Sequence, residues 1–147
     1  MAELKDSKCD ANPAGVNVKV ANGGKIEKAG SYYTYTLPGV SGGVDALGLS
    51  RLNSKRSSAV EIKYPVDETC EYTLELDGLK AVTKSKTASV RNSAGSVEMS
   101  ISVSGDKVTV KRSIKLNKSV FAPAELKDLQ ALLAEWNSAS WKKLILK

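Results

Sequence analysis

A chain of 147 residues is long enough for one domain, which can bury roughly two-thirds of the surface that the unfolded chain exposes. Its 41% apolar and 26% charged residues are typical of a globular protein and exclude a disordered one. The net charge of +6 raises the question of nucleic acid, but the basic residues are scattered. We therefore expect a solvated basic surface and no nucleic acid partner.

Histidine is the most informative residue type, because the chain contains none. This excludes a Ser-His-Asp or Cys-His nucleophile and removes the commonest ligand of transition metals. The carboxylates fall mostly on outward faces of predicted strands, where ion pairs with neighbouring lysines account for them. We expect a protein that is not an enzyme, with no catalytic residue, no metal and no cofactor.

The two cysteines, Cys9 and Cys70, form no C-x-x-C motif. A disulfide between them would need an oxidising compartment, and two free thiols are the favoured alternative. No apolar run approaches the ~20 residues of a membrane span. Residues 1–12 lack the apolar core of a signal peptide, so either the protein is not exported or this is a mature domain cut from a longer precursor.

Residues 1–15 are expected to be an irregular lead-in, because Pro13 and Gly15 interrupt any regular pattern. Alternation predicts a short strand over residues 16–20 and an extended segment from Ile26. The β-branched and aromatic residues 31–37 predict a strong strand.

Residues 39–58 are the least regular stretch, with four glycines and several serines. A loop of this length inside a compact domain is often functional or a crossover between sheets. We favour a long connection over the edge of the sandwich.

From residue 59 the pattern becomes regular again. Alternating apolar residues predict strands over residues 60–64, 72–76, 79–83, 86–91, 97–103 and 108–116, separated by turns at Gly78, Gly95 and Gly105. Arg112 falls among the apolar positions of its strand. We expect it to lie near a sheet edge or to pair with a carboxylate.

The period changes after Phe121. Pro123 suits the first turn of a helix, and Leu126, Leu129, Leu133 and Trp136 form an apolar stripe, with Leu132 beside it. A helix is predicted over about 123–137, its stripe packed in the core, and residues 141–146 form a last strand or turn. The fold class is mainly β: an antiparallel β-sandwich, immunoglobulin-like or related, over residues 16–147 with one C-terminal α-helix.

The best candidate for a ligand or interface surface is the tyrosine-rich strand with the basic residues that follow it. Tyr33 and Tyr35 share one face, and Arg51, Lys55 and Arg56 lie in the long loop. Exposed tyrosines on a sheet can stack on sugars or hold a peptide. The alternative is that these tyrosines cover the core.

The order of several segments resembles the C-terminal domain of bacterial transglutaminase-like multidomain proteins. The segments are 30–38 (GSYYTYTLP), 55–56 (KR), 62–65 (IKYP), 72–78 (YTLELDG), 110–116 (VKRSIKL), 123–129 (PAELKDL), 136–137 (WN) and 143–146 (KLIL). The resemblance covers roughly residues 16–147. It implies a β-sandwich of unknown function that follows a papain-like transglutaminase core.

The resemblance also implies export to the periplasm or cell surface, and it carries no catalytic residue onto this chain. The leading hypothesis is a non-catalytic accessory domain that packs against the catalytic core or shapes access to it. Its partners would be the other domains of the parent protein. The alternative is a free-standing module that binds a glycan or a peptide.

Overall fold

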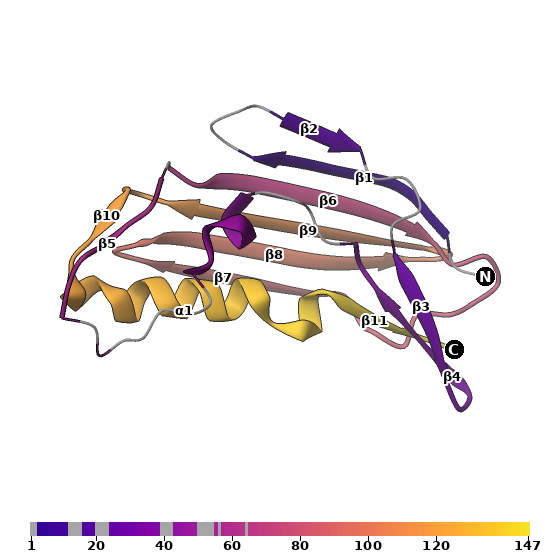
Figure 1. The fold of residues 1–147 in the computed structure, drawn as a ribbon. Helices are drawn as coiled ribbons and strands as arrows, with labels where there is room; N and C mark the ends of the chain where they lie inside the picture. The colour runs from indigo at the N-terminus through magenta and orange to yellow at the C-terminus, as the bar shows by residue number, and fades with distance from the viewer. Residues whose placement is uncertain are drawn as a thin grey trace.

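The computed structural model describes residues 3–11, 16–19, 24–38, 43–49, 55, 57–63 and 65–147. The larger of its sheets has six antiparallel strands in the order β2-β1-β6-β9-β8-β7 (Figure 1). These strands are β1 (Glu3–Ala11), β2 (Val16–Lys19), β6 (Asp67–Glu75), β7 (Lys86–Asn92), β8 (Gly95–Ser104) and β9 (Lys107–Leu116).

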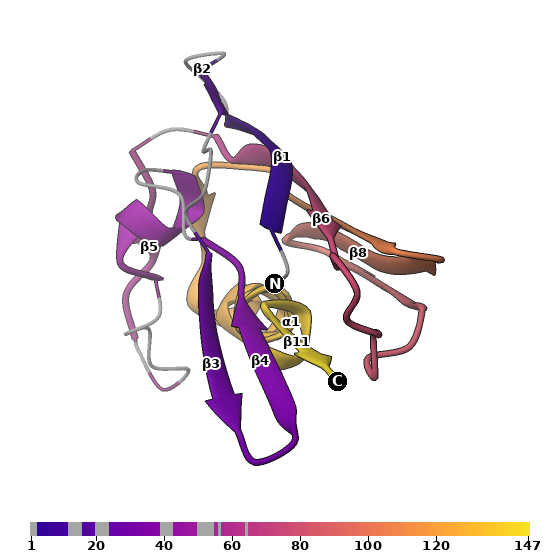
Figure 2. The ribbon, with the colours of Figure 1, turned by 90° about the vertical axis from the view of Figure 1, so that its right-hand side faces the viewer.

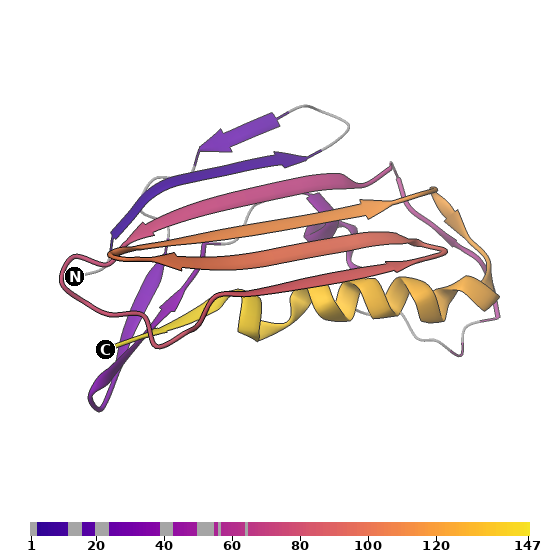
Figure 3. The same ribbon diagram turned by 180° about the vertical axis from the view of Figure 1, so that it is seen from behind.

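One face of this sheet is covered by the helix α1 (Leu126–Asn137), which runs along β7, β8 and β9 (Figure 3). Close to the end of α1 lies a three-stranded sheet of order β11-β4-β3, made by β3 (Lys25–Ala29), β4 (Tyr32–Thr36) and β11 (Lys143–Leu146) (Figure 2). The two-stranded pair of β5 (Val60–Glu61) and β10 (Val120–Phe121) lies near the start of α1 (Figure 1). The predicted fold class, mainly β with antiparallel sheets in a sandwich-like arrangement and one C-terminal helix, is confirmed.

The central strands follow the alternation seen in the sequence. Along β9, every second residue from Val108 to Leu116 is buried, and its neighbours face solvent or are half-buried. The same holds for β6 and β8, so their inner faces and α1 enclose one apolar core. The turn at Asp77 and Gly78, both at positive φ, ends this pattern after β6.

The apolar stripe of α1 is used inside the domain. The residues of the stripe and its neighbour, Leu126, Leu129, Leu132, Leu133 and Trp136, are all buried. The 3-10 helix Pro123–Glu125 precedes α1, and a second one, Ala139–Trp141, leads into β11. The helix predicted over about 123–137 is therefore present, and its stripe packs in the core and leaves no apolar face for a partner.

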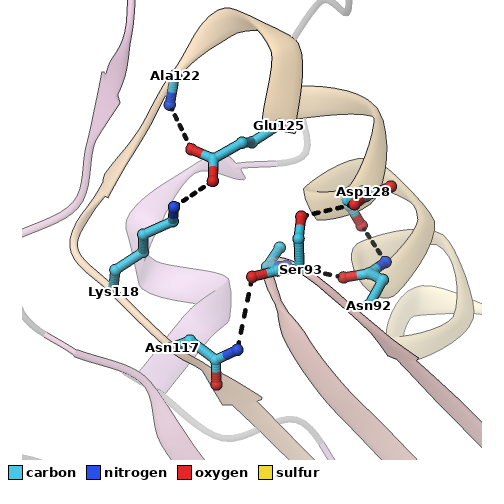
Figure 4. Close-up of polar contacts among 8 residues, drawn as sticks. Asn92, Ser93, Asn117, Lys118, Ala122, Glu125 and Asp128 are labelled. Atoms are coloured by element: carbon cyan, nitrogen blue, oxygen red, sulfur yellow. Dashed lines mark hydrogen bonds and ion pairs between the residues drawn. The ribbon is translucent and has the colours of Figure 1, made fainter.

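Polar contacts fix the start of α1 to the sheet (Figure 4). Asn92 Nδ2 donates to the Asp128 carbonyl oxygen at 2.8 Å, and Ser93 Oγ donates to Asp128 Oδ2 at 2.6 Å. Glu125 accepts the backbone N–H of Ala122 at 2.8 Å and pairs with Lys118. Since each of these groups positions the helix, we read the cluster as structural.

Two expectations are wrong. Residues 3–11 are not irregular: they form β1, which pairs with both β2 and β6. Cys70 is not a free thiol: it is disulfide-bonded, and the residue opposite it in strand register is Cys9, the other cysteine of the sequence. Alternation on β1 is broken by a register shift between Leu4 and Asp6, which explains why its pattern did not predict a strand.

Two of the predicted strands are shorter in the structure. Of residues 60–63, Val60–Glu61 forms a strand, and the segment 79–83 contributes an isolated bridge between Ala81 and Leu146. No helix in the described ranges has the length and apolar character that a bilayer crossing would need.

Candidate functional site

Of the residues predicted to form a ligand surface, Tyr33, Tyr35 and Lys55 lie in the part of the chain that the structure describes. Tyr35 is only 4% exposed and belongs to the core, where burial raises the pKa of its hydroxyl. Tyr33 is half-buried, with the Lys28 ammonium 5.9 Å from its ring centroid. Lys55 is exposed, while Arg51 and Arg56 lie outside the described residues. A Tyr33–Tyr35 ladder is therefore not an open binding face.

The exposed aromatic side chain of β4 is Tyr32, on the opposite face of the strand. It is 43% exposed, and on the same face Ile145 of β11 and Val82 are 36% and 43% exposed. Val82 N–H donates to the Ile145 carbonyl at 2.8 Å, and Ile145 lies opposite Thr34, two residues from Tyr32. We call Tyr32, Val82 and Ile145 the apolar patch.

Lysines surround the apolar patch. The Lys147 ammonium lies 5.6 Å from the Tyr32 ring centroid, and Lys143 shares the alternation of Ile145 on β11. Lys80 pairs with Lys147 through two backbone hydrogen bonds of 2.8 Å. One carboxylate shares this face: Glu27 of β3 lies opposite Thr34 and is bound to Lys25 at 2.7 Å. An apolar centre with a basic rim is typical of a protein interaction surface.

The alternation of β4 carries a signal for this patch, because it separates Tyr32 from Tyr33 and Tyr35. Alternation places Tyr33 and Tyr35 together and Tyr32 apart, but it does not say which face the core covers. Which face of β4 is buried depends on long-range packing, in which β11, a strand near the C-terminus, pairs with β4.

The outer face of the six-stranded sheet is polar. It has a shallow hollow of about 490 Å3, and half of the residues that line it are serine or threonine, with Glu98 and Lys111 among the others. Glu98 pairs with Arg91 at 3.4 Å, and Lys111 pairs with Glu71 at 3.7 Å. Ion pairing thus accounts for these carboxylates, as the sequence predicted, and the face is a solvated one.

On the inner face, Arg112 is 6% exposed on β9, a central strand. Its Nη2 donates to the Trp136 carbonyl at 2.5 Å, and its guanidinium lies 4.0 Å from the centroid of the Trp136 ring. The expected edge position is wrong, because β9 lies between β6 and β8. No carboxylate in the described part of the chain forms an ion pair with Arg112, although Asp45 and Glu68 act on its charge from nearby. Arg112 instead donates to the C-terminal end of α1, where carbonyl oxygens lack helical partners and carry partial negative charge.

Two titratable side chains of β6 are buried close to Arg112. Glu68 is 3% exposed and accepts the backbone N–H of Val44 at 2.8 Å, which fixes the 3-10 helix Gly43–Leu47 to the sheet. Burial raises the pKa of Glu68, while the Val44 N–H acts in the opposite sense. Tyr72 is 1% exposed, donates to the Pro38 carbonyl at 3.2 Å and also interacts with Arg112.

Two cavities lie beside these groups. The inner cavity, about 50 Å3, is lined by Glu68, Tyr72, Arg112 and Trp136 among others. The outer cavity, about 240 Å3, is lined by Val44, Leu49, Leu133 and Asn137. Both are also lined by Asp45 and Lys142, so they adjoin. In the part of the chain that the structure describes, no group of three or more histidine, cysteine or acidic side chains could hold a metal ion.

Comparisons with known proteins give two matches. A family described as "Domain of Unknown Function with solved-structure structure (DUF3858)" matches residues 33–146. The crystal structure of a "putative protease" from Parabacteroides distasonis superposes with a TM-score of 0.70 and 33% sequence identity. That match covers 78% of this chain and 23% of the Parabacteroides chain, so this chain spans less than a quarter of the neighbour's length. No curated protein sequence matches.

Proposed function

Because the chain belongs to the DUF3858 family of domains of unknown function, we propose that it is a non-catalytic accessory domain of a larger, exported transglutaminase-like protein. In that protein it packs against the catalytic core or shapes access to it. The observation that carries the proposal is the apolar patch of Tyr32, Val82 and Ile145 with its rim of lysines, which fits an acidic protein surface with an apolar centre.

The length of the structural neighbour supports a role within a larger protein. The segment similar to this chain is 23% of a longer polypeptide, and that polypeptide is described as a "putative protease". Papain-like proteases and transglutaminases use a cysteine nucleophile with a histidine base. Since this chain has no histidine, a parent protein with that chemistry would hold the base in another domain.

The bonding state of Cys70 supports export. Disulfides form and persist in oxidising compartments such as the periplasm and the cell surface, and they are rare in the cytosol of most organisms. A disulfide-bonded Cys70 within the larger sheet is consistent with a domain that folds after export.

The surfaces of the domain differ in how well they suit docking. The outer face of the large sheet is covered by hydroxyl and paired charged groups, whose desolvation would cost free energy without burying apolar area. The apolar patch offers three large side chains that are already partly exposed. An interdomain contact is therefore more favourable at the β4–β11 face than on the large sheet.

Cysteine labelling tests the proposal directly. Val82→Cys places a thiol in the apolar patch, and Ser102→Cys places one on the exposed outer face as a matched control. We expect a thiol reagent to modify both variants quickly in the isolated chain. In the full parent protein, modification at position 82 should slow at least tenfold while position 102 keeps its rate. Equal rates at position 82 in both proteins would contradict docking through this patch.

The rival function, a free-standing glycan- or peptide-binding module, gives a different result in the same experiment. It requires position 82 to remain open in the native protein and its modification to be slowed by an added oligosaccharide or peptide. Burial of Tyr35 removes one of the two rings on which that hypothesis was based.

A further inference from the structure

The two adjoining cavities near the end of α1 have different linings at their two ends. The inner cavity is small, and Arg112 and Trp136 are among the residues that line it. The outer cavity is larger, and Val44, Leu49 and Leu133 give it apolar walls. Asp45 and Lys142 line both, at the place where the cavities adjoin.

Two buried hydrogen-bond donors, on residues that line the inner cavity, have no partner in the described part of the chain. They are Nε of Arg112, a residue 6% exposed, and Nε1 of Trp136, a residue 1% exposed. The chain's other tryptophan shows the usual arrangement, since Trp141 Nε1 donates to Glu135 Oε1 at 2.6 Å. A buried donor without an acceptor costs about 1–3 kcal/mol, so a pair of them beside a cavity indicates an acceptor supplied from outside the chain.

The charge of Arg112 is only partly compensated. Its guanidinium contacts a neutral carbonyl, an aromatic ring and the Tyr72 hydroxyl. The carboxylates of Asp45 and Glu68 act on its charge from nearby, but no described carboxylate forms an ion pair with it. A buried cation in this position favours an anionic acceptor over a neutral one. The two oxygens of a carboxylate can accept hydrogen bonds from separate N–H groups. The inner cavity, about 50 Å3, has room for little more than a carboxylate.

We propose that these cavities bind a small carboxylate with a short apolar substituent. The carboxylate occupies the inner cavity and accepts hydrogen bonds from Arg112 Nε and Trp136 Nε1. The apolar part lies in the outer cavity against Val44, Leu49 and Leu133. The ligand is either a free short-chain carboxylic acid or the C-terminal carboxylate of a peptide that ends in an apolar residue.

The charged side chains around the site can accommodate a bound carboxylate if one of their own carboxylates takes up a proton. Arg112 and Lys142 are positive, Glu68 and Asp45 are negative, and Tyr72 is neutral. Burial already raises the pKa of Glu68, and an adjacent carboxylate would raise it further. Binding should therefore be accompanied by proton uptake at Glu68, which calorimetry in buffers of different ionisation enthalpy detects.

The test is an NMR titration of the complete chain, followed at the two indole N–H resonances, which belong to Trp136 and Trp141. The probes are sodium acetate, sodium isovalerate, the neutral isovaleramide and N-acetyl-Gly-Leu with a free C-terminus, all at constant ionic strength in sodium chloride. We expect a carboxylate to shift the Trp136 resonance with a millimolar dissociation constant, on the order that few-atom ligands reach. The Trp141 resonance and the isovaleramide titration should show no saturable change.

Each arm of the titration has a defined meaning. Saturation by isovalerate at lower concentration than acetate supports a free acid with its substituent in the outer cavity. Saturation by the peptide alone supports a peptide C-terminus as the source. The absence of saturation by any carboxylate, or an equal response to isovaleramide, overturns the proposal and leaves water as the occupant of the inner cavity.

A matched pair of variants tests the donors. Trp136→Phe removes Nε1 and keeps a ring beside Arg112, whereas Trp141→Phe removes an N–H that already has an acceptor. Calorimetry should show binding of the best carboxylate weakened by about tenfold in the first variant, the effect of one hydrogen bond to a charged group, and unchanged in the second. Equal affinities in both variants, with folding verified by circular dichroism, would contradict the assigned contact.

Discussion

Arg112 occupies an inward-facing position of β9, and the other inward-facing residues of this strand are apolar. Its alkyl part packs in the core while its charged end meets the last carbonyls of α1 and the ring of Trp136. The sequence marks this residue as unusual, because alternation places it among valines and leucines. It does not reveal the partner, since a helix C-terminus has no residue type of its own that a pattern could match.

Two substitutions separate the packing of Arg112 from its charge. Arg112→Met keeps most of the side-chain volume, whereas Arg112→Ala leaves a cavity in the core. We expect the alanine variant to be less stable than the methionine variant by about 2 kcal/mol, because the cavity adds to the loss of the hydrogen bond. Urea denaturation of the two variants measures the difference, and equal midpoints would show that the side chain's bulk contributes little.

Glu68 makes the stability of the fold depend on pH. Its pKa in the folded protein is raised above the ordinary 4.5 by burial, so in the window above pH 4.5 the folded state holds a proton that the unfolded state has lost. The free energy of unfolding contributed by this group therefore falls as pH rises through that window. Glu68→Gln, which keeps an oxygen acceptor for Val44 N–H, should remove this fall.

The expected comparison is a denaturation series from pH 4 to pH 8. Relative to the unchanged protein, the glutamine variant should gain stability as pH rises, and the two should converge at low pH. Glu71→Gln, at an exposed position of the same strand, is the matched control for the loss of a carboxylate. A constant difference across the series would contradict the role assigned to burial of Glu68.

At the scale of elements, alternation predicted the strands that lie between the helix and solvent. Residues 86–91, 97–103 and 108–116 are found as β7, β8 and β9, because each strand has one face toward solvent and one toward the core. The strand β1 was missed because its register shifts within the strand. The apolar patch was missed for another reason. Its residues come together because β4 pairs with β11, a strand more than 100 residues away in the sequence, and local periodicity does not predict that pairing.

The turn that begins β8 depends on a residue without a side chain. Gly95 has φ of 154°, and a Cβ added there would lie 1.9 Å from the Lys115 carbonyl oxygen of the paired strand β9. Gly95→Ala should therefore destabilise the protein by roughly 2–4 kcal/mol, as its backbone must move away from β9. Chemical denaturation measures the loss.

Gly105 provides the control for this prediction. It has φ of 58° in the turn between β8 and β9, and an added Cβ would meet no atom within 4 Å. Gly105→Ala should cost only about 1–2 kcal/mol, the strain of a left-handed backbone. If both variants lost equal stability, backbone conformation and not the approach of Lys115 would be the cause at Gly95.

At the scale of the whole molecule, Cys70 makes the redox state a determinant of stability. It is disulfide-bonded within β6, the strand that joins β1 and β2 to the rest of the six-stranded sheet. We expect a reductant to lower the stability of the unchanged protein by about 2–5 kcal/mol. Cys70→Ala should show the lower stability in both conditions. A thermal denaturation midpoint unaffected by reductant in the unchanged protein would contradict this.

The placement of α1 after the whole six-stranded sheet has a consequence for biosynthesis. β9 ends at Leu116 and α1 ends at Asn137, so a ribosome adding 5–20 residues per second needs about 1–4 s to extend the chain from one to the other. Throughout that interval a nascent chain that had already paired its strands would present an uncovered inner face of valine, leucine and isoleucine, and a chain that is exported before it folds does not pass through this state. Translational pausing in this interval would prolong that exposure, and chaperones that hold apolar segments should be needed most at that stage.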